Sequence, residues 1–124
     1  MVNVEVDAGI APVVKALSLF PMLKTRSSCE GNRDPSELSA GVMFIYGPTE
    51  GKVPAPWKES AAFIFDFFAP RLWAKVHDMA SLSMGFSRGH TYLIRLALAP
   101  NCIDKVAEAI IAIHAEWKAQ RGLP

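Results

Sequence analysis

Residues 91–117, TYLIRLALAPNCIDKVAEAIIAIHAEW, contain the clearest helix pattern of the chain, directly after a strand pattern. In residues 91–98 apolar side chains alternate with others, as in a strand with one buried face. From residue 101 onward, apolar residues recur at spacings of three and four, which predicts an amphipathic helix: Ile103, Val106, Ile110, Ile113 and Trp117. We expect Asn101 and Asp104 to cap this helix. The segment therefore predicts a helix that packs one stripe onto a sheet.

The N-terminal third of the chain predicts one helix followed by two strands. Residues 10–17 place apolar side chains on one helical face, and Pro21 ends that helix. Residues 23–29 alternate as an exposed or edge strand does, with one side formed by Leu23, Thr25, Ser27 and Cys29. Residues 41–46 form a short apolar run between two glycines, which favours a buried strand.

The middle of the chain allows more than one interpretation. Residues 61–68 are apolar and rich in phenylalanine, and we expect them to form a third strand. In that strand the lone carboxylate of Asp66 needs a partner, for which Arg95 is the candidate. We expect a helix from Pro70 to a C-terminal cap at Gly85. Residues 81–86 could instead form a strand that pairs with residues 91–98.

The order helix, three strands, helix, strand, helix predicts an α+β fold. We expect a mostly antiparallel sheet of four to five strands with about three helices packed on one face. The length of 124 residues fits a single domain, residues 1–124. The sequence has no GxGxxG or P-loop glycine pattern, so no motif supports a dinucleotide or triphosphate cradle.

Composition and charge limit the classes of function. Hydrophobic residues make up 51% of the chain and charged residues 20%, which excludes a disordered chain. The formal net charge of +1 argues against strong nonspecific binding of nucleic acid. The two cysteines have no zinc-ligand spacing, so we expect no metal site. No apolar run approaches the length of about 20 residues that a membrane helix needs. We expect a cytoplasmic protein with no membrane partner.

The most reactive stretch of the chain is residues 25–33, TRSSCEGNR, where a strand gives way to a loop. Arginines on both sides of Cys29 favour its thiolate, so Cys29 is the candidate nucleophile and Glu30 the candidate general base. Residues next to them in sequence are the candidate ligand-binding group: Ser27, Ser28, Gly31 and Arg33. The alternative interpretation is a small packed cysteine followed by a tight turn.

Arg88 and His90 form a second candidate group, at the start of the last predicted strand. The Arg88 guanidinium suits a phosphate or a carboxylate, which it can bind through two parallel hydrogen bonds. The alternative is a simple turn with a solvated arginine. A single binding site built from Cys29, Glu30, Arg88 and His90 requires these two turns to meet in space.

The motif Ser27-Ser28-Cys29-Glu30-Gly31, after an N-terminal helix and before a Gly85-Phe86 turn, resembles the methyltransferase-like family of tRNA wybutosine synthesis. The resemblance implies an enzyme that uses S-adenosylmethionine on a hypermodified guanosine of tRNA. It also implies that the cysteine motif and the Gly-Phe turn line the site. The family's usual Ser-Gly-Arg after the cysteine reads Glu30-Gly31-Asn32 here, which adds a negative charge and removes an arginine.

These observations predict an α+β protein that binds a small or nucleotide-like ligand near Cys29. S-adenosylmethionine as cofactor, tRNA as partner and methyl transfer as reaction are implied by the resemblance alone. The rival hypothesis is a noncatalytic interaction module that forms a homodimer through an exposed sheet or aromatic surface. A third hypothesis, a thiol redox sensor, requires Cys29 to react much faster than Cys102.

Overall fold

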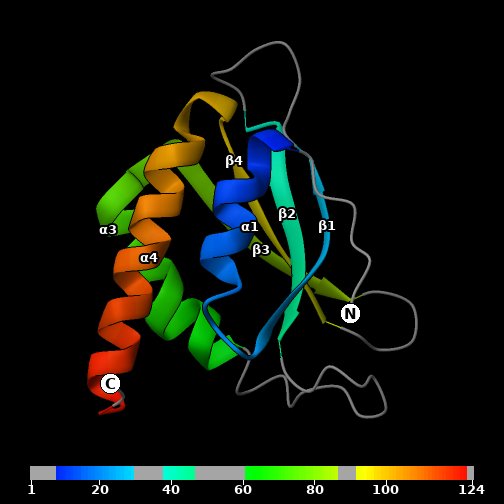
Figure 1. Cartoon of the computed structure of the whole chain (residues 1–124). Coiled ribbons are helices and arrows are strands. Elements are labelled where there is room, and N and C mark those ends of the chain that lie inside the picture. Colours follow the sequence, from blue (N-terminus) through cyan, green and yellow to red (C-terminus); the bar gives the residue numbers. More distant parts are fainter. Residues whose placement is uncertain (1–7, 30–37, 47–60, 87–91, 123–124) are drawn as a thin grey trace.

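The computed structural model describes residues 8–29, 38–46, 61–86 and 92–122 (Figure 1). Its main elements, in chain order, are α1 (Ala11–Leu17), β1 (Leu23–Cys29), β2 (Ala40–Tyr46), the π-helix η2 (Ala62–Phe68), α3 (Ala69–Val76), β3 (Ala80–Phe86), β4 (Tyr92–Leu98) and α4 (Ile103–Gln120). Short 3-10 turns precede α1, β3 and α4, at Ala8–Ile10, His77–Met79 and Pro100–Cys102. The α+β class is thus confirmed.

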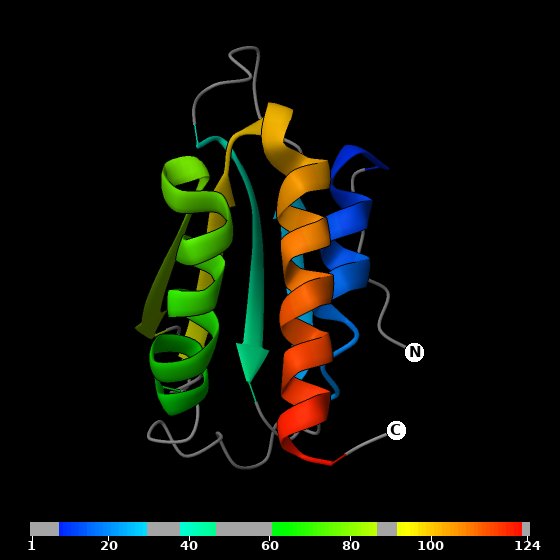
Figure 2. The ribbon, with the colours of Figure 1, turned by 90° about the vertical axis from the view of Figure 1, so that its left-hand side faces the viewer.

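The four strands form one antiparallel sheet in the order β1-β2-β4-β3. Helices α1, α3 and α4 lie in one layer on one face of this sheet (Figure 2), and α4 packs against both of the others. No described helix covers the other face, which we call the outer face. The predicted arrangement, with helices on one face of a mostly antiparallel sheet, is confirmed.

The hydrophobic core lies between the two layers. Alternate residues of β2 and β4 point into it and are fully buried, as expected of strands with one face on the core. The helices contribute the apolar stripes that the 3,4 spacing predicts, including Ile110, Ile113 and Trp117 of α4. Phe20, just before β1, meets four rings in edge-to-face geometry: those of Phe63, Phe68, His114 and Trp117.

The predicted third strand at residues 61–68 is wrong, because η2 and α3 form one continuous helical segment there. Phe63, Ile64 and Phe68 are buried, whereas Phe65 is 45% exposed, which is a helical and not an alternating pattern. The wide π turn also precedes Pro70, a residue that cannot donate a backbone hydrogen bond. Burial against the helix layer therefore overrides the strand preference of the phenylalanines.

The predicted helix over residues 70–85 is too long, and its strand alternative is correct. Helix α3 ends at Val76, and His77 follows with φ 50° and ψ −128°, a conformation that breaks the helix. Residues Ala80–Phe86 then form β3, paired with β4, so Gly85 lies in a strand and caps no helix. Since one expected strand is lost and one is gained, the sheet keeps four strands.

The expected cap of the last helix is also wrong. Helix α4 begins at Ile103, its N-cap residue is Cys102, and no side chain hydrogen-bonds the free N–H groups there. The 3-10 turn at Pro100–Cys102 displaces Asn101 from the capping position. None of the helices in the described part of the chain is long and apolar enough to cross a membrane.

Partial burial of His114 makes stability depend on pH. Burial lowers the pKa of His114 from 6.5, and the charge of Lys118 lowers it further, while a hydrogen bond with the Leu19 backbone partly opposes both. The unfolded chain therefore binds a proton at His114 more readily than the folded protein does. The contribution of neutral His114 to the free energy of unfolding is complete above pH 6.5. It is lost as the pH falls through the lowered pKa of the folded state.

The free energy of unfolding should fall between about pH 7.5 and about pH 5.5, and we expect it to fall less in His114→Gln than in the unchanged protein. Urea unfolding followed by circular dichroism measures this difference. Lys118→Gln, which removes one cause of the shift, should reduce it by a smaller amount. An unchanged pH dependence in His114→Gln would contradict the assignment.

Candidate functional site

A β-bulge in β1 divides the predicted motif between the two faces of the sheet. Thr25 is opposite Phe44 in the register, but Ser27 is opposite Met43, so Arg26 has no partner on β2. The extra residue reverses the alternation after the bulge. The expectation that Thr25 and Ser27 share one side of the strand is therefore wrong.

The two serines of the motif have different environments because of this bulge. Ser28 is opposite the buried Val42, and its Oγ is buried without a hydrogen-bond partner among the described residues. Ser27 is exposed on the outer face. Of the two candidate serines, Ser27 is thus the one that a ligand from solvent can reach.

Two rows of residues cross the outer face at the motif. The first, which we call the Arg95 row, runs over the four strands as Ser27, Met43, Arg95 and Ser83. The second, which we call the Gly41 row, runs beside it as Cys29, Gly41, Ala97 and Ser81. The Gly41 row is built from small residues only.

Gly41 allows the Arg95 side chain to extend from its own row toward the motif. A Cβ atom at Gly41 would lie 3.9 Å from Arg95 Nε and 3.0 Å from the Leu96 carbonyl oxygen. Arg95 therefore passes over Gly41, and Cys29 is the residue opposite Gly41 on the next strand. The sheet thus brings a guanidinium to the cysteine motif, although the two are far apart in sequence.

The charges of the sheet all have one sign. Lys24 and Arg26 on β1 and Arg95 on β4 are its charged residues, and the four strands contain no aspartate or glutamate. Arg95 is exposed and forms no ion pair with any other described residue. The expected pair of Arg95 with Asp66 is wrong, because Asp66 is exposed on η2 in the helix layer.

Five of the predicted site residues lie outside the described part of the chain: Glu30, Gly31, Arg33, Arg88 and His90. The strand ends that flank them are described. Cys29 is at the sheet end where β3 begins and β4 ends, whereas Phe86 and Tyr92 pair at the opposite end. The sequence predicted Arg33 and Arg88 as the ligand-binding arginines, and the structure adds Arg95, whose signal in the sequence is a lone charge within an apolar strand.

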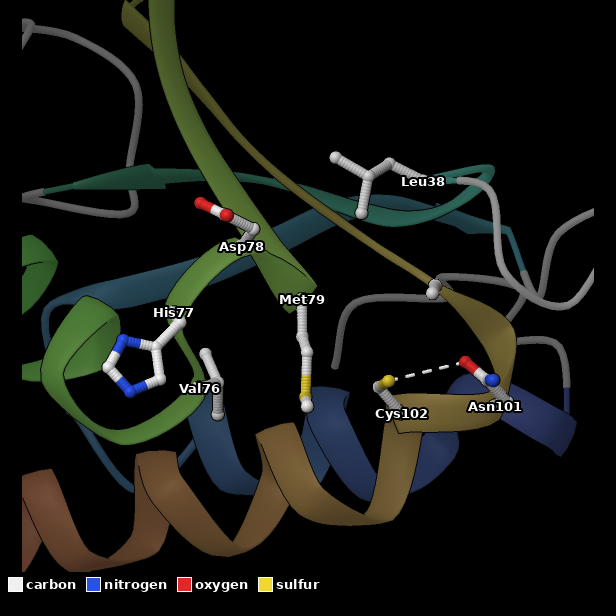
Figure 3. A pocket seen from close by; sticks show the side chains of 8 residues that line it. Leu38, Val76, His77, Asp78, Met79, Asn101 and Cys102 are labelled. Carbon is white, nitrogen blue, oxygen red and sulfur yellow. Dashed lines mark hydrogen bonds between the residues drawn. The ribbon is translucent and has the colours of Figure 1, made fainter.

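A separate cavity of about 410 Å³ lies below the same end of the sheet (Figure 3), and Leu38, His77, Asp78 and Cys102 are among its lining residues. The Cys102 thiol donates a hydrogen bond to Asn101 Oδ1 at 3.2 Å. Figure 3 shows the His77 ring separated from Cys102 by the side chains of Val76 and Met79. The cavity therefore lacks the Cys–His pair that thiol catalysis needs.

Comparisons with known proteins do not assign the chain to a family. No protein-family model matches it, and neither a curated protein nor a solved structure is significantly similar to it. Among the described residues, no three histidine, cysteine or acidic side chains gather as metal ligands do. The outer face of the sheet therefore carries the described candidate residues Ser27 and Arg95.

Proposed function

We propose that this protein binds a nucleotide-like ligand with an anionic group, on the outer face of the sheet beside Cys29. The observation that carries the proposal is the exposed Arg95 guanidinium, which extends over Gly41 and is unpaired among the described residues. A guanidinium binds phosphate or carboxylate oxygens through two parallel, charge-assisted hydrogen bonds.

The neighbours of Arg95 suit the rest of such a ligand. The hydroxyls of Ser27 and Ser83 belong to the same row and can hydrogen-bond a phosphate or a ribose. Gly41, Ala97 and Ser81 in the Gly41 row are small, so a flat ring can lie on this part of the outer face. Lys24 and Arg26 add positive potential, and no acidic residue on the strands opposes it.

Methyl transfer would extend this binding function, as the resemblance implies. Cys29 is one strand away from Gly41, a spacing of about 4.8 Å in a sheet, so its backbone is close to the bound anion. In this extension Cys29 and Glu30 are the candidate catalytic residues: a nucleophilic atom of the substrate takes the methyl group of S-adenosylmethionine, Glu30 accepts the proton that this atom loses, and S-adenosylhomocysteine leaves. The motif supports these roles.

A homodimer through the outer face is the second candidate function. Met43, Ile45 and Leu93 are only half-buried there, and apolar residues of this kind stabilise interfaces. A two-fold pairing of this face, however, would bring the cationic sheets of two copies together without an acidic partner on any strand. The charge of the face therefore favours the anionic ligand.

Calorimetric titration with adenosine 5′-monophosphate and with adenosine tests the proposal. We expect the monophosphate to bind and Arg95→Ala to weaken that binding by about tenfold or more, because a charge-assisted hydrogen-bond pair is lost. Adenosine, which lacks the phosphate, should bind more weakly and respond little to Arg95→Ala. Lys105→Ala, an exposed cation of α4, is the matched control for charge.

Equal affinity of Arg95→Ala and Lys105→Ala for the monophosphate would contradict the proposal, as would the absence of heat from the folded protein. A parallel titration with S-adenosylmethionine, repeated on Cys29→Ala, tests the methyl-transfer extension separately. A sedimentation experiment on the same samples tests the homodimer, which predicts a mass twice that of the chain.

A further inference from the structure

A second cavity, of about 490 Å³, lies on the helix side of the sheet and is separate from the outer face. Its described lining comes from three elements and consists of Tyr46, Ala62, Phe63, Phe67, Trp117, Gln120 and Arg121. Four of these residues are aromatic, and Arg121 is the charged residue among them. The cavity therefore combines an aromatic lining with one cation.

The π-helix arranges two residues of this lining. Its wide turn brings both Phe67 and Phe68 to Phe63, with ring centroids 5.8 Å and 5.9 Å from the Phe63 centroid. The Phe63 and Phe67 rings are nearly parallel, at 21°, and Tyr46 lies at 5.7 Å from Phe63 on the sheet side. π-Helical turns are rare and are frequent at functional sites. Here the turn makes a stack of rings that borders a cavity.

The cation of the cavity is available to a ligand. Arg121 is exposed after the last turn of α4, and its guanidinium carbon lies 4.7 Å from the centroid of the Trp117 ring. It forms no ion pair with another described residue. The neighbouring Arg71, by contrast, stacks on Phe67 at 3.9 Å and lies 3.8 Å from the Glu116 carboxylate.

These charges select the class of ligand. A cationic ligand would meet two guanidiniums that already stack on the aromatic rings, so a cation-binding aromatic cage is disfavoured. Because Phe67 already stacks on Phe63 and carries the Arg71 guanidinium over its ring, a planar ligand ring meets the aromatic lining edge to face, and a carboxylate on that ring can pair with Arg121. We propose that this cavity is a second binding site, for an aromatic carboxylate whose ring packs edge to face against the aromatic lining and whose carboxylate binds Arg121.

Titration calorimetry with 2-naphthoate and with the uncharged 2-naphthalenemethanol tests this site. We expect Arg121→Gln to weaken the binding of 2-naphthoate by about tenfold or more and to leave the alcohol unaffected. Phe67→Leu, which keeps an apolar side chain and removes the ring, should weaken both compounds. Lys118→Gln removes a charge one turn earlier, outside the cavity lining, and should change neither affinity.

Three results would overturn the proposal: no binding of 2-naphthoate at millimolar concentration, equal affinity in Arg121→Gln, or an equal loss in Lys118→Gln. Unchanged urea midpoints in Arg121→Gln and Lys118→Gln show that the comparison is made on folded protein. The site does not depend on the outer face, so failure of adenosine 5′-monophosphate to bind leaves this test intact.

Discussion

Phe20→Ala is expected to lower the free energy of unfolding by about 3–5 kcal/mol, a large part of the stability of a small domain. Phe20 is fully buried and touches the rings of Phe63, Phe68, His114 and Trp117, with centroids 5.0–6.0 Å away. Truncation removes these contacts and leaves a cavity. The cavity stays open because η2, α4 and the segment before β1 cannot all move inward to fill it. Urea unfolding followed by circular dichroism measures the loss.

Leu19→Ala is the matched control, because Leu19 is the preceding residue and is 43% exposed. Its expected cost is within about 0.5 kcal/mol, as for most surface substitutions. Phe20→Leu, which preserves more volume, should fall between the two. If Phe20→Ala and Leu19→Ala lowered the free energy of unfolding equally, this would contradict the placement of Phe20 in the hydrophobic core.

Ile64→Asp is expected to unfold the protein or to lower its unfolding free energy by more than about 3 kcal/mol. Ile64 is fully buried in η2, and an unpaired carboxylate there loses its hydration without gaining a partner. The measurement is again the urea midpoint, with size-exclusion chromatography to detect an unfolded or aggregated product.

Phe65→Asp provides the matched control and distinguishes the helix from a strand. In η2 the Phe65 ring is 45% exposed, so its replacement should cost little. In a strand over residues 61–68, Phe63, Phe65 and Phe67 would share one face, and Phe65→Asp would then be the damaging change whenever that face is buried. A larger cost for Phe65→Asp than for Ile64→Asp would therefore contradict the helix.

The errors of the sequence interpretation have a common physical origin. Phenylalanines favour strands on average, but this preference is weaker than the free energy of burying one face against a neighbouring layer. A continuous apolar run such as residues 61–68 contains no period that separates the two outcomes. At residues 81–86, by contrast, the strand alternative was visible, and pairing with β4 selected it.

At the candidate site, too, local sequence determined some features and tertiary packing determined others. The motif Ser27-Ser28-Cys29 marks a reactive strand end in the sequence, and the structure places it at the end of β1. The bulge at Arg26 and the contact between Arg95 and Gly41 depend on register, which local sequence does not specify. Sequence reasoning therefore predicted Ser27 and Cys29 together with Arg88, which lies outside the described residues, and the register of the sheet adds Arg95 as a further candidate.

Local sequence alone was sufficient for the α+β class, helix α1, helix α4 and strands β1, β2 and β4. The two helices and β4 have a hydrophobic period, β1 alternates in sequence, and β2 is a short apolar run bounded by glycines. The tertiary structure was needed for the helix at residues 61–76, for the strand order β1-β2-β4-β3 and for the face on which each serine lies. Period is a property of neighbouring residues, whereas burial, register and bulges arise only when distant segments pack together.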